Sequence, residues 1–334
     1  MTIRELAKIA KVSPATISLV LNDKPGVGEK KRRQILSLLD DIGFDKEKRR
    51  VRCSGNKTLL FIKLVKSGYL VDENAGFIAK IMDSIQAECN GKGYSLQIQV
   101  VHGNFDHALA AVEYHKLCGV FVLGTELEVA DYSILDHITV PYVVIDNSMS
   151  HFDCNSITMN NEEMAYEAVK YLASTNEKRI GYFCGGLTTQ NFIERGQGLK
   201  KAIEDFGLSY DETTDRFMLV PSISLSYQKM KAYLESGAKV PRLVFSDNDI
   251  IAIGAVKAMA EFDIRVPEDV AVFGFDDIYL AQTAAPPLST FHVYRTLIGK
   301  MATMMLLDEI EGDQPACVKI KVGGSMVVRK STPQ

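Results

Sequence analysis

A short helix is predicted from residue 14. The residues expected on its outer side are Pro14, Ala15, Ser18 and Leu19. Hydroxyl and aliphatic groups presented on a helix can contact base edges or thymine methyl groups in the major groove. The expected chemistry is therefore DNA contact, as in the second helix of a helix-turn-helix. The DNA-contacting residues that we predict are Thr2, Ser13, Pro14, Ala15, Thr16, Ser18, Leu19 and Asn22, with Arg49, Arg50 and Arg52 further along.

Two short helices joined by a tight turn must position this surface. Ser13 is a predicted N-cap, and Pro14 occupies the first helical position, where its missing N–H costs nothing. The apolar stripes expected to be buried are Ile3, Leu6, Ile9 and Ala10 in the first helix and Ile17, Val20 and Leu21 in the second. The alternative interpretation is a helical hairpin that only packs against the rest of the protein.

The charge distribution favours a DNA-binding head. Residues 1–57 contain 14 Lys and Arg against 7 Asp and Glu, a net charge of +7. The remaining residues contain 24 basic and 35 acidic side chains, a net charge of −11, so the whole chain carries −4. A basic head on an acidic body is typical of proteins that bind a polyanion through one small domain.

Length and composition exclude several classes. No apolar run in the 334 residues approaches the ~20 residues of a membrane span, and the charged N-terminus lacks the apolar region of a signal peptide. The six cysteines have no CxxC or Cys/His metal spacing, so we expect a cytoplasmic, nucleoid-associated protein without metal or cofactor. Enzymatic activity is not expected either, because no GxGxxG, P-loop, HExxH or GxSxG pattern is present.

The remainder of the chain predicts an α/β fold. A third helix is expected over 27–44, followed by a basic linker over 45–57. From residue 58, apolar strand candidates alternate with helical segments, which favours parallel sheets covered by helices on both faces. The predicted strands are 59–65, 95–101, 119–123, 142–146, 157–159, 179–184, 216–220, 242–245 and 270–275. The predicted helices include 77–89, 161–173, 195–206, 227–234 and 249–262.

Several motifs in this order resemble the lactose-repressor (LacI/GalR) family along almost the whole chain. They are TIRELAKIAKVSPATISLVLN and KPGV in the head, GVFVLG at 119–124, PYVVID at 141–146, RIG at 179–181, NDIIAIGA at 248–255, VPEDVAVFGFDD at 266–277 and PPLST at 286–290. The resemblance implies a helix-turn-helix head on a core similar to periplasmic binding proteins, with two doubly wound parallel-sheet lobes.

The resemblance also implies a domain division. The head is expected over 1–44, the linker over 45–57 and the core over 58–330. Within the core, lobe 1 would comprise about 58–157 and 290–320, and lobe 2 about 158–288 and 321–330. The chain would cross between lobes near 157–160, 287–292 and 319–324.

The implied function is transcriptional regulation, most simply repression. Two heads of a homodimer would read a near-palindromic double-stranded DNA operator, and a small sugar-like effector between the lobes would change operator affinity. The chain ends without a leucine heptad extension that could join dimers into tetramers, which agrees with a dimer.

By resemblance, the effector-binding residues are Phe77, Asp146, Arg195, Asn248 and Asp276. Arg195 is expected to open the helix after RIGYFC, where its guanidinium could bind hydroxyl or carboxylate oxygens. Asp276 follows a strand, and the carboxyl ends of parallel strands are where open sheets bind ligands. Structural roles compete with these assignments. Asn248 and Asp249 can cap a helix, Asp277 can cap the next turn, and Phe77 can belong to the core.

Three features depart from the family pattern. Leu19 stands where an arginine is usual, and Pro14 stands where a polar residue is usual. The linker FDKEKRRVRCSG lacks the leucine of the family hinge, which predicts weak DNA kinking and steep salt dependence. Pro221 stands where the family often has an aromatic residue that stacks on a sugar ring, so the sequence supports a sugar effector less strongly than in the family generally.

Two other functions also fit the sequence. A solute-binding receptor would share the core but would not need the basic head. A DNA-binding regulator could also be controlled by a partner protein instead of a metabolite, and nothing in the sequence separates the two modes of control.

Overall fold

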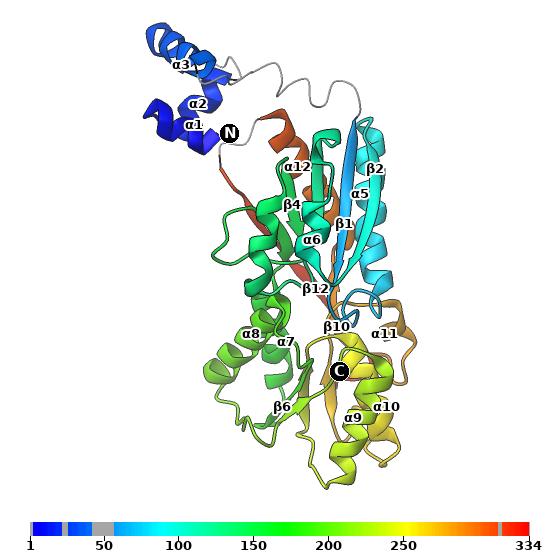
Figure 1. Ribbon diagram of the computed structural model, residues 1–334. Coiled ribbons are helices and arrows are strands. Elements are labelled where there is room, and N and C mark those ends of the chain that lie inside the picture. The colour runs from blue at the N-terminus through cyan, green and yellow to red at the C-terminus, as the bar shows by residue number, and fades with distance from the viewer. Residues whose placement is uncertain (1–2, 22–25, 42–56, 313–315, 334) are drawn as a thin grey trace.

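A computed structural model describes residues 3–21, 26–41, 57–312 and 316–333 (Figure 1). Three helices form the head: α1 (Ile3–Ala10), α2 (Pro14–Leu21) and α3 (Glu29–Asp41). The predicted third helix therefore begins two residues later than expected. The linker that we predicted over 45–57 lies outside the described residues except for its last residue.

The head has its own apolar core. The buried residues are Leu6, Ala7, Ile17, Val20, Leu21, Ile35 and Leu39. The predicted stripe of α2 is confirmed. In α1 the prediction for Ile9 is wrong, because its side chain is 44% exposed. Ala7 faces the core beside Leu6 instead, so the buried side of the helix is rotated away from Ile9.

The predicted N-cap of α2 is confirmed. The backbone N–H of Thr16 donates to Ser13 Oγ at 3.1 Å, which satisfies one of the free N–H groups of the first helical turn.

Ser13→Ala is expected to lower the stability of the head by about 1 kcal/mol, because the N–H of Thr16 loses its acceptor. Hydrogen exchange of α2 amides in the full-length protein without DNA measures this change. Ser13→Gly should cost only a few tenths of a kcal/mol. Equal exchange rates in Ser13→Ala and the parent protein would show that the cap contributes nothing.

The first core sheet has six parallel strands in the order β11-β5-β4-β3-β1-β2. Its strands are β1 (Thr58–Val65), β2 (Ser95–His102), β3 (Gly119–Leu123), β4 (Tyr142–Ile145), β5 (Asn155–Met159) and β11 (Lys319–Val322). Its helical segments are α5 (Ala75–Gly91), α6 (Phe105–Ala110), η1 (Tyr114–Lys116), η2 (Val129–His137) and α12 (Arg295–Glu311). Apolar residues of α5 and α12 cover one face, and those of α6 and η2 cover the other.

The second sheet has four parallel strands in the order β7-β6-β8-β9. These are β6 (Ile180–Cys184), β7 (Arg216–Met218), β8 (Leu243–Ser246) and β9 (Ala271–Phe273). The helices are α7 (Asn161–Ala173), α8 (Gln190–Phe206), α9 (Ile223–Glu235), α10 (Asp249–Ala260) and α11 (Tyr279–Thr283). Residues of α7 and α8 cover one face, and those of α9 and α10 cover the other. The expected doubly wound α/β class is confirmed.

Three short segments connect the two sheets (Figure 1). Strand β5 leads through Asn160 into α7, and β11 leads through Gly323 into β12 (Gly324–Val327). Strand β10 (Thr290–Val293) pairs antiparallel with β12, and isolated bridges attach it to the end of β9. It leads through Tyr294 into α12 of the first sheet. Both sheets point the carboxyl ends of their strands toward this junction.

None of the helices within the described ranges is long and apolar enough to cross a bilayer.

Candidate effector cleft and DNA-reading head

A small cavity lies between the carboxyl ends of the two sheets. Its volume of about 20 Å³ is room for about one water molecule. The structure brings all five predicted effector residues to it. The lining residues are Leu70, Asn74, Phe77, Thr125, Asp146, Met159, Asn191, Phe192, Arg195, Asn248 and Asp276.

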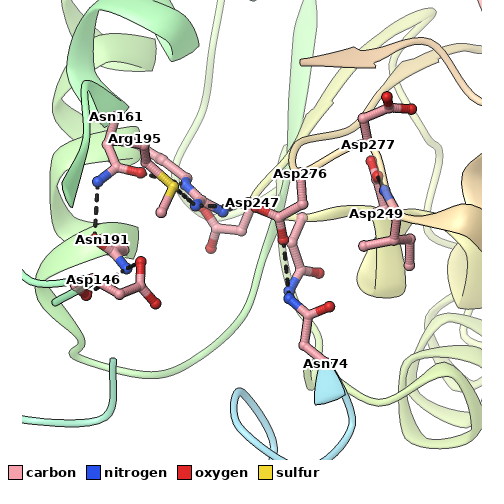
Figure 2. A network of polar contacts seen from close by, with 12 residues as sticks. Asn74, Asp146, Asn161, Asn191, Arg195, Asp247, Asp249, Asp276 and Asp277 are labelled. Carbon is pink, nitrogen blue, oxygen red and sulfur yellow. Dashed lines mark hydrogen bonds and ion pairs between the residues drawn. The ribbon is translucent and has the colours of Figure 1, made fainter. Parts of the chain in front are cut away.

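Arg195 occupies the centre of the polar network (Figure 2). The prediction that it opens its helix is wrong, because α8 begins at Gln190 and Arg195 lies in the second turn. The first turn of α8 lies before Arg195 and contains Asn191 and Phe192, which are both buried. This places the guanidinium inside the protein, with only 3% of the residue exposed.

The donors of Arg195 are almost all used within the protein. Nε donates to Asn161 Oδ1 at 2.9 Å, and one terminal nitrogen donates to the backbone oxygen of Asp247. The other terminal nitrogen lies 3.4 Å from Asp276 Oδ1 and 3.2 Å from the sulfur of Met159. The guanidinium carbon also lies 3.7 Å from the ring centroid of Phe275, which is a cation–π contact.

Asp276 connects the two sheets. Asn74, the residue before α5 of the first sheet, donates from Nδ2 to the Asp276 carboxylate at 3.4 Å. Arg195, in α8 beside the second sheet, donates to the other carboxylate oxygen. Burial raises the pKa of Asp276, and the positive charges of Arg195 and Arg295 oppose this change. Its backbone φ of 110° is unusual for a residue with a side chain, and it turns the chain after β9 toward the cavity.

Asp146 directly follows β4 and forms a second connection. Thr125 Oγ1 donates to one carboxylate oxygen at 2.6 Å, and Asn191 Nδ2 donates to the other at 3.0 Å. Burial raises the pKa of Asp146 from 3.8 to about 6, although these hydrogen bonds favour the charged form.

The raised pKa of Asp146 predicts a pH effect on stability. The folded protein binds more protons than the unfolded chain between pH values of about 4 and 6, so this group stabilises less as pH rises through that window. The uncharged variant Asp146→Asn should lack this contribution. Urea unfolding at several pH values is therefore expected to show the parent losing stability relative to Asp146→Asn from pH 4 to 6. Parallel pH profiles would contradict the assignment.

Asn248 has the capping role that competed with ligand binding. Its Oδ1 accepts from the N–H of Ile251 at 2.9 Å and caps α10. Its Nδ2 makes no hydrogen bond to any residue that the structure describes, although the residue lines the cavity. The cap therefore leaves one donor of Asn248 available to a ligand.

The carboxylates of Asp249 and Asp277, which follow Asn248 and Asp276 in the chain, form hydrogen bonds with other groups of the protein. Asp249 accepts from Thr290 Oγ1 at 2.7 Å and from the N–H of Ile278 at 3.0 Å, and burial raises its pKa well above the usual value. Asp277 is not a helix cap. It accepts from His292 Nδ1 at 2.8 Å and from Arg329 at 2.6 Å, so it fastens β10 to the chain after β12.

Phe77 is both a core residue and a cavity residue, so the two roles considered for it do not exclude each other. Its ring belongs to the apolar core of the first sheet and also lines the cavity, with the guanidinium carbon of Arg295 5.4 Å from the ring centroid.

Five polar residues of the network were not predicted from the sequence, namely Asn74, Thr125, Asn161, Asn191 and Asp247. Two of them follow strands, and the three asparagines stand at or next to helix starts. The rule that ligands collect at strand carboxyl ends would have found Thr125 and Asp247. Asparagines at helix starts are usually read only as caps.

Glu126 organises the loop that carries Leu70 and Asn74. The buried carboxylate accepts four backbone N–H groups, from Lys66, Ser67, Gly68 and Leu70, at 2.6–3.2 Å. Ser67 Oγ adds a fifth hydrogen bond at 3.0 Å. One carboxylate thus satisfies four backbone donors of a loop that belongs to no helix or strand.

The head presents part of the predicted DNA-contacting set on its surface. Ser13 and Ala15 are exposed, whereas Pro14, Thr16 and Leu19 are half-buried. Ser18 lies within α2, but its side chain lies outside what the structure describes. The remaining candidates, namely Thr2, Asn22, Arg49, Arg50 and Arg52, also lie outside the described residues.

A helix-turn-helix head on a two-sheet core with a polar cleft defines the class of binding-protein-like DNA-binding regulators. A family model described as periplasmic binding protein-like domain matches residues 157–332, and one described as bacterial regulatory proteins, lacI family, matches residues 2–46. The chain belongs to the lacI family of bacterial regulatory proteins and is a DNA-binding transcriptional regulator. The resemblance inferred from its motifs is confirmed.

Curated relatives match from end to end. The HTH-type transcriptional repressor PurR of Vibrio vulnificus (strain CMCP6) is 26% identical over 336 residues, covering 98% of this chain and 97% of the relative. PurR of Haemophilus influenzae (strain ATCC 51907 / DSM 11121 / KW20 / Rd) is 28% identical over 343 residues, covering 99% and 98%.

Solved structures share the fold. The lac repressor dimer bound to operator and the anti-inducer ONPF superposes with a TM-score of 0.73 at 23% identity. A complex of the transcriptional regulator CelR with cellobiose gives 0.72, also at 23% identity. Each comparison covers 99% of both chains.

Proposed function

We propose that this protein is a repressor that binds a near-palindromic operator as a homodimer in the cytoplasm and is switched by a small effector. The observation that carries the proposal is one polar cavity lined by Asp146, Arg195 and Asp276 between two sheets, in a chain with a helix-turn-helix head. We also propose the domain boundaries predicted above, with a head over 1–44 and a core over 58–330.

The chemistry of the cavity favours a neutral, hydroxyl-rich effector. Two carboxylates face one guanidinium, and that guanidinium already donates to Asp276 and Asn161. An anionic ligand would therefore compete with Asp276 for Arg195, whereas hydroxyl groups can donate to carboxylates and accept from Asn248 Nδ2. Phe77 and Phe192 add apolar surface for the body of a ring. We propose that the effector binds to the five residues predicted from the sequence, namely Phe77, Asp146, Arg195, Asn248 and Asp276.

Effector binding must separate the two sheets. A cavity with room for about one water molecule cannot hold a sugar. Hydrogen bonds from Asn74 to Asp276 and from Asn191 to Asp146 join the two sides in the closed form. An effector that replaces these contacts would favour a different arrangement of the lobes, and operator affinity would change with that population.

Asn248→Ser separates ligand binding from helix capping. Serine keeps an N-cap oxygen but removes the Nδ2 donor. We expect effector affinity to fall by about tenfold or more, the loss of one hydrogen bond worth ~1.5 kcal/mol, with operator binding and stability nearly unchanged. Neutral sugars and polyols would first be screened for a shift of operator binding by the parent protein. An unchanged effector response in Asn248→Ser would remove this residue from the site.

Control by a partner protein is a second candidate. The polar groups around the cavity largely satisfy one another, and the cavity is small. If no metabolite shifts operator binding while a protein partner does, this alternative replaces the effector. In that outcome the DNA-binding role remains and only the signal changes.

A further inference from the structure

Two cysteines lie opposite each other where strands β5 and β11 begin. The parallel register pairs Ser156 with Lys319. Continued two residues back along both chains, this register places Cys154 opposite Cys317. The ladder reaches toward this point, because the N–H of Ser156 donates to the oxygen of Val318 at 3.0 Å. Neighbouring strands lie about 4.8 Å apart, and a disulfide joins Cα atoms about 4.4–6.8 Å apart.

The two side chains belong to the same face of the sheet. Ile320 and Val322 of β11 pack with Ile157 and Met159 of β5 on the face covered by α5 and α12. Cys154 packs on the opposite face, among the apolar residues under α6 and η2. Because side chains alternate along a strand, Cys317 also belongs to that opposite face.

The electrostatics agree with this proximity. The pKa of Tyr142, at the start of the next strand β4, is raised chiefly by burial, and both thiols raise it further. Burial raises the pKa of Cys154 to about 12, with Lys319 opposing the change and Cys317 adding to it. Cys154 is buried, whereas Cys317 is exposed. The pair thus combines one thiol that a solute can reach with one that it cannot.

We propose that Cys154 and Cys317 form an oxidation site, in which a peroxide converts the two thiols into a disulfide. The Cys317 thiolate attacks the O–O bond, forming a sulfenic acid and releasing hydroxide. The sulfur of Cys154 then attacks the sulfenic sulfur, the new S–S bond forms, and the sulfenic oxygen leaves as water with the proton of Cys154. Two thiols and one hydrogen peroxide give one disulfide and two waters.

The bond would join the chain just before β5 to the chain just before β11, two neighbouring strands that each lead out of the first sheet. Strand β5 continues into α7, and β11 continues into β12. A cross-link between the cysteines that precede these strands closes a long chain loop, and it should raise the midpoint of thermal unfolding relative to the reduced protein. This inference does not depend on the identity of the effector or operator.

The test uses the reduced full-length protein with its six cysteines. After hydrogen peroxide and then N-ethylmaleimide under denaturing conditions, we expect four labelled cysteines and one cross-linked peptide pair containing residues 154 and 317. Dithiothreitol should restore six. Cys317→Ser, a change at an exposed residue, should abolish the cross-link. The matched control Cys184→Ser, a buried thiol of the second sheet, should retain it.

Other products would overturn the proposal. Oxidation of Cys317 to a sulfinic acid with Cys154 still reduced would show that the buried thiol cannot reach it. A cross-link from Cys317 to Cys53 or to a second copy of the chain would assign the oxidation to a different pair.

Discussion

Arg195→Ala is expected to lower the free energy of unfolding of the core by about 3–5 kcal/mol, the usual effect of removing one partner from a buried ion pair. The variant leaves Asp276 buried without its guanidinium, and it removes the donor to Asn161 and the cation–π contact with Phe275. Urea unfolding of the full-length protein measures the change. The same variant should lose its effector response.

The matched control is Arg265→Ala. Arg265 pairs with Asp269, four residues later in a turn after α10, but its side chain is 69% exposed, so the variant should change stability by no more than about 0.5 kcal/mol. If Arg195→Ala were as stable as this control, the network around Arg195 would not contribute to folding. Its role would then be confined to the ligand.

Ala15→Glu is expected to weaken operator binding by about 100-fold or more. Ala15 is exposed in the first turn of α2, and a carboxylate there would face the phosphates and base acceptors of the groove. Opposed like charges at an interface cost several kcal/mol, and about 2.7 kcal/mol corresponds to 100-fold. Fluorescence anisotropy with an operator fragment measures the loss.

Ala260→Glu is the control for this experiment. It adds the same charge at an exposed helical position of the core, at the end of α10. It should bind operator like the parent protein. Wild-type affinity in Ala15→Glu would show that α2 does not enter the groove and would move recognition to another element.

Most of the core architecture could be predicted from the sequence because buried parallel strands are nearly continuous apolar runs. The strand 119–123 and the helix 161–173 were predicted with the bounds that the structure gives them. Errors arose where periodicity is short or ambiguous. Ile9 lies in an eight-residue helix, too short for its buried side to be read reliably. The start of α8 was missed because the polar residues before Arg195 resembled a turn.

The network between the sheets could be predicted only in part. Asp146 and Asp276 follow strands, which is a local signal, and family resemblance supplied Arg195. The hydrogen bond from Asn74 to Asp276 joins residues 202 positions apart, and neither residue indicates the other. The arrangement around Glu126 is equally hidden, since a single carboxylate accepts N–H groups from a loop about 60 residues away.

The most direct test of the account is footprinting of the purified protein on its own upstream DNA, with and without neutral sugars and polyols. We expect protection of two half-sites whose centres lie about 10 base pairs, or a multiple of this, apart, and a change of affinity with one of the small molecules. Weak binding that is the same on every sequence would contradict the account, because α2 would then lack sequence recognition of its own.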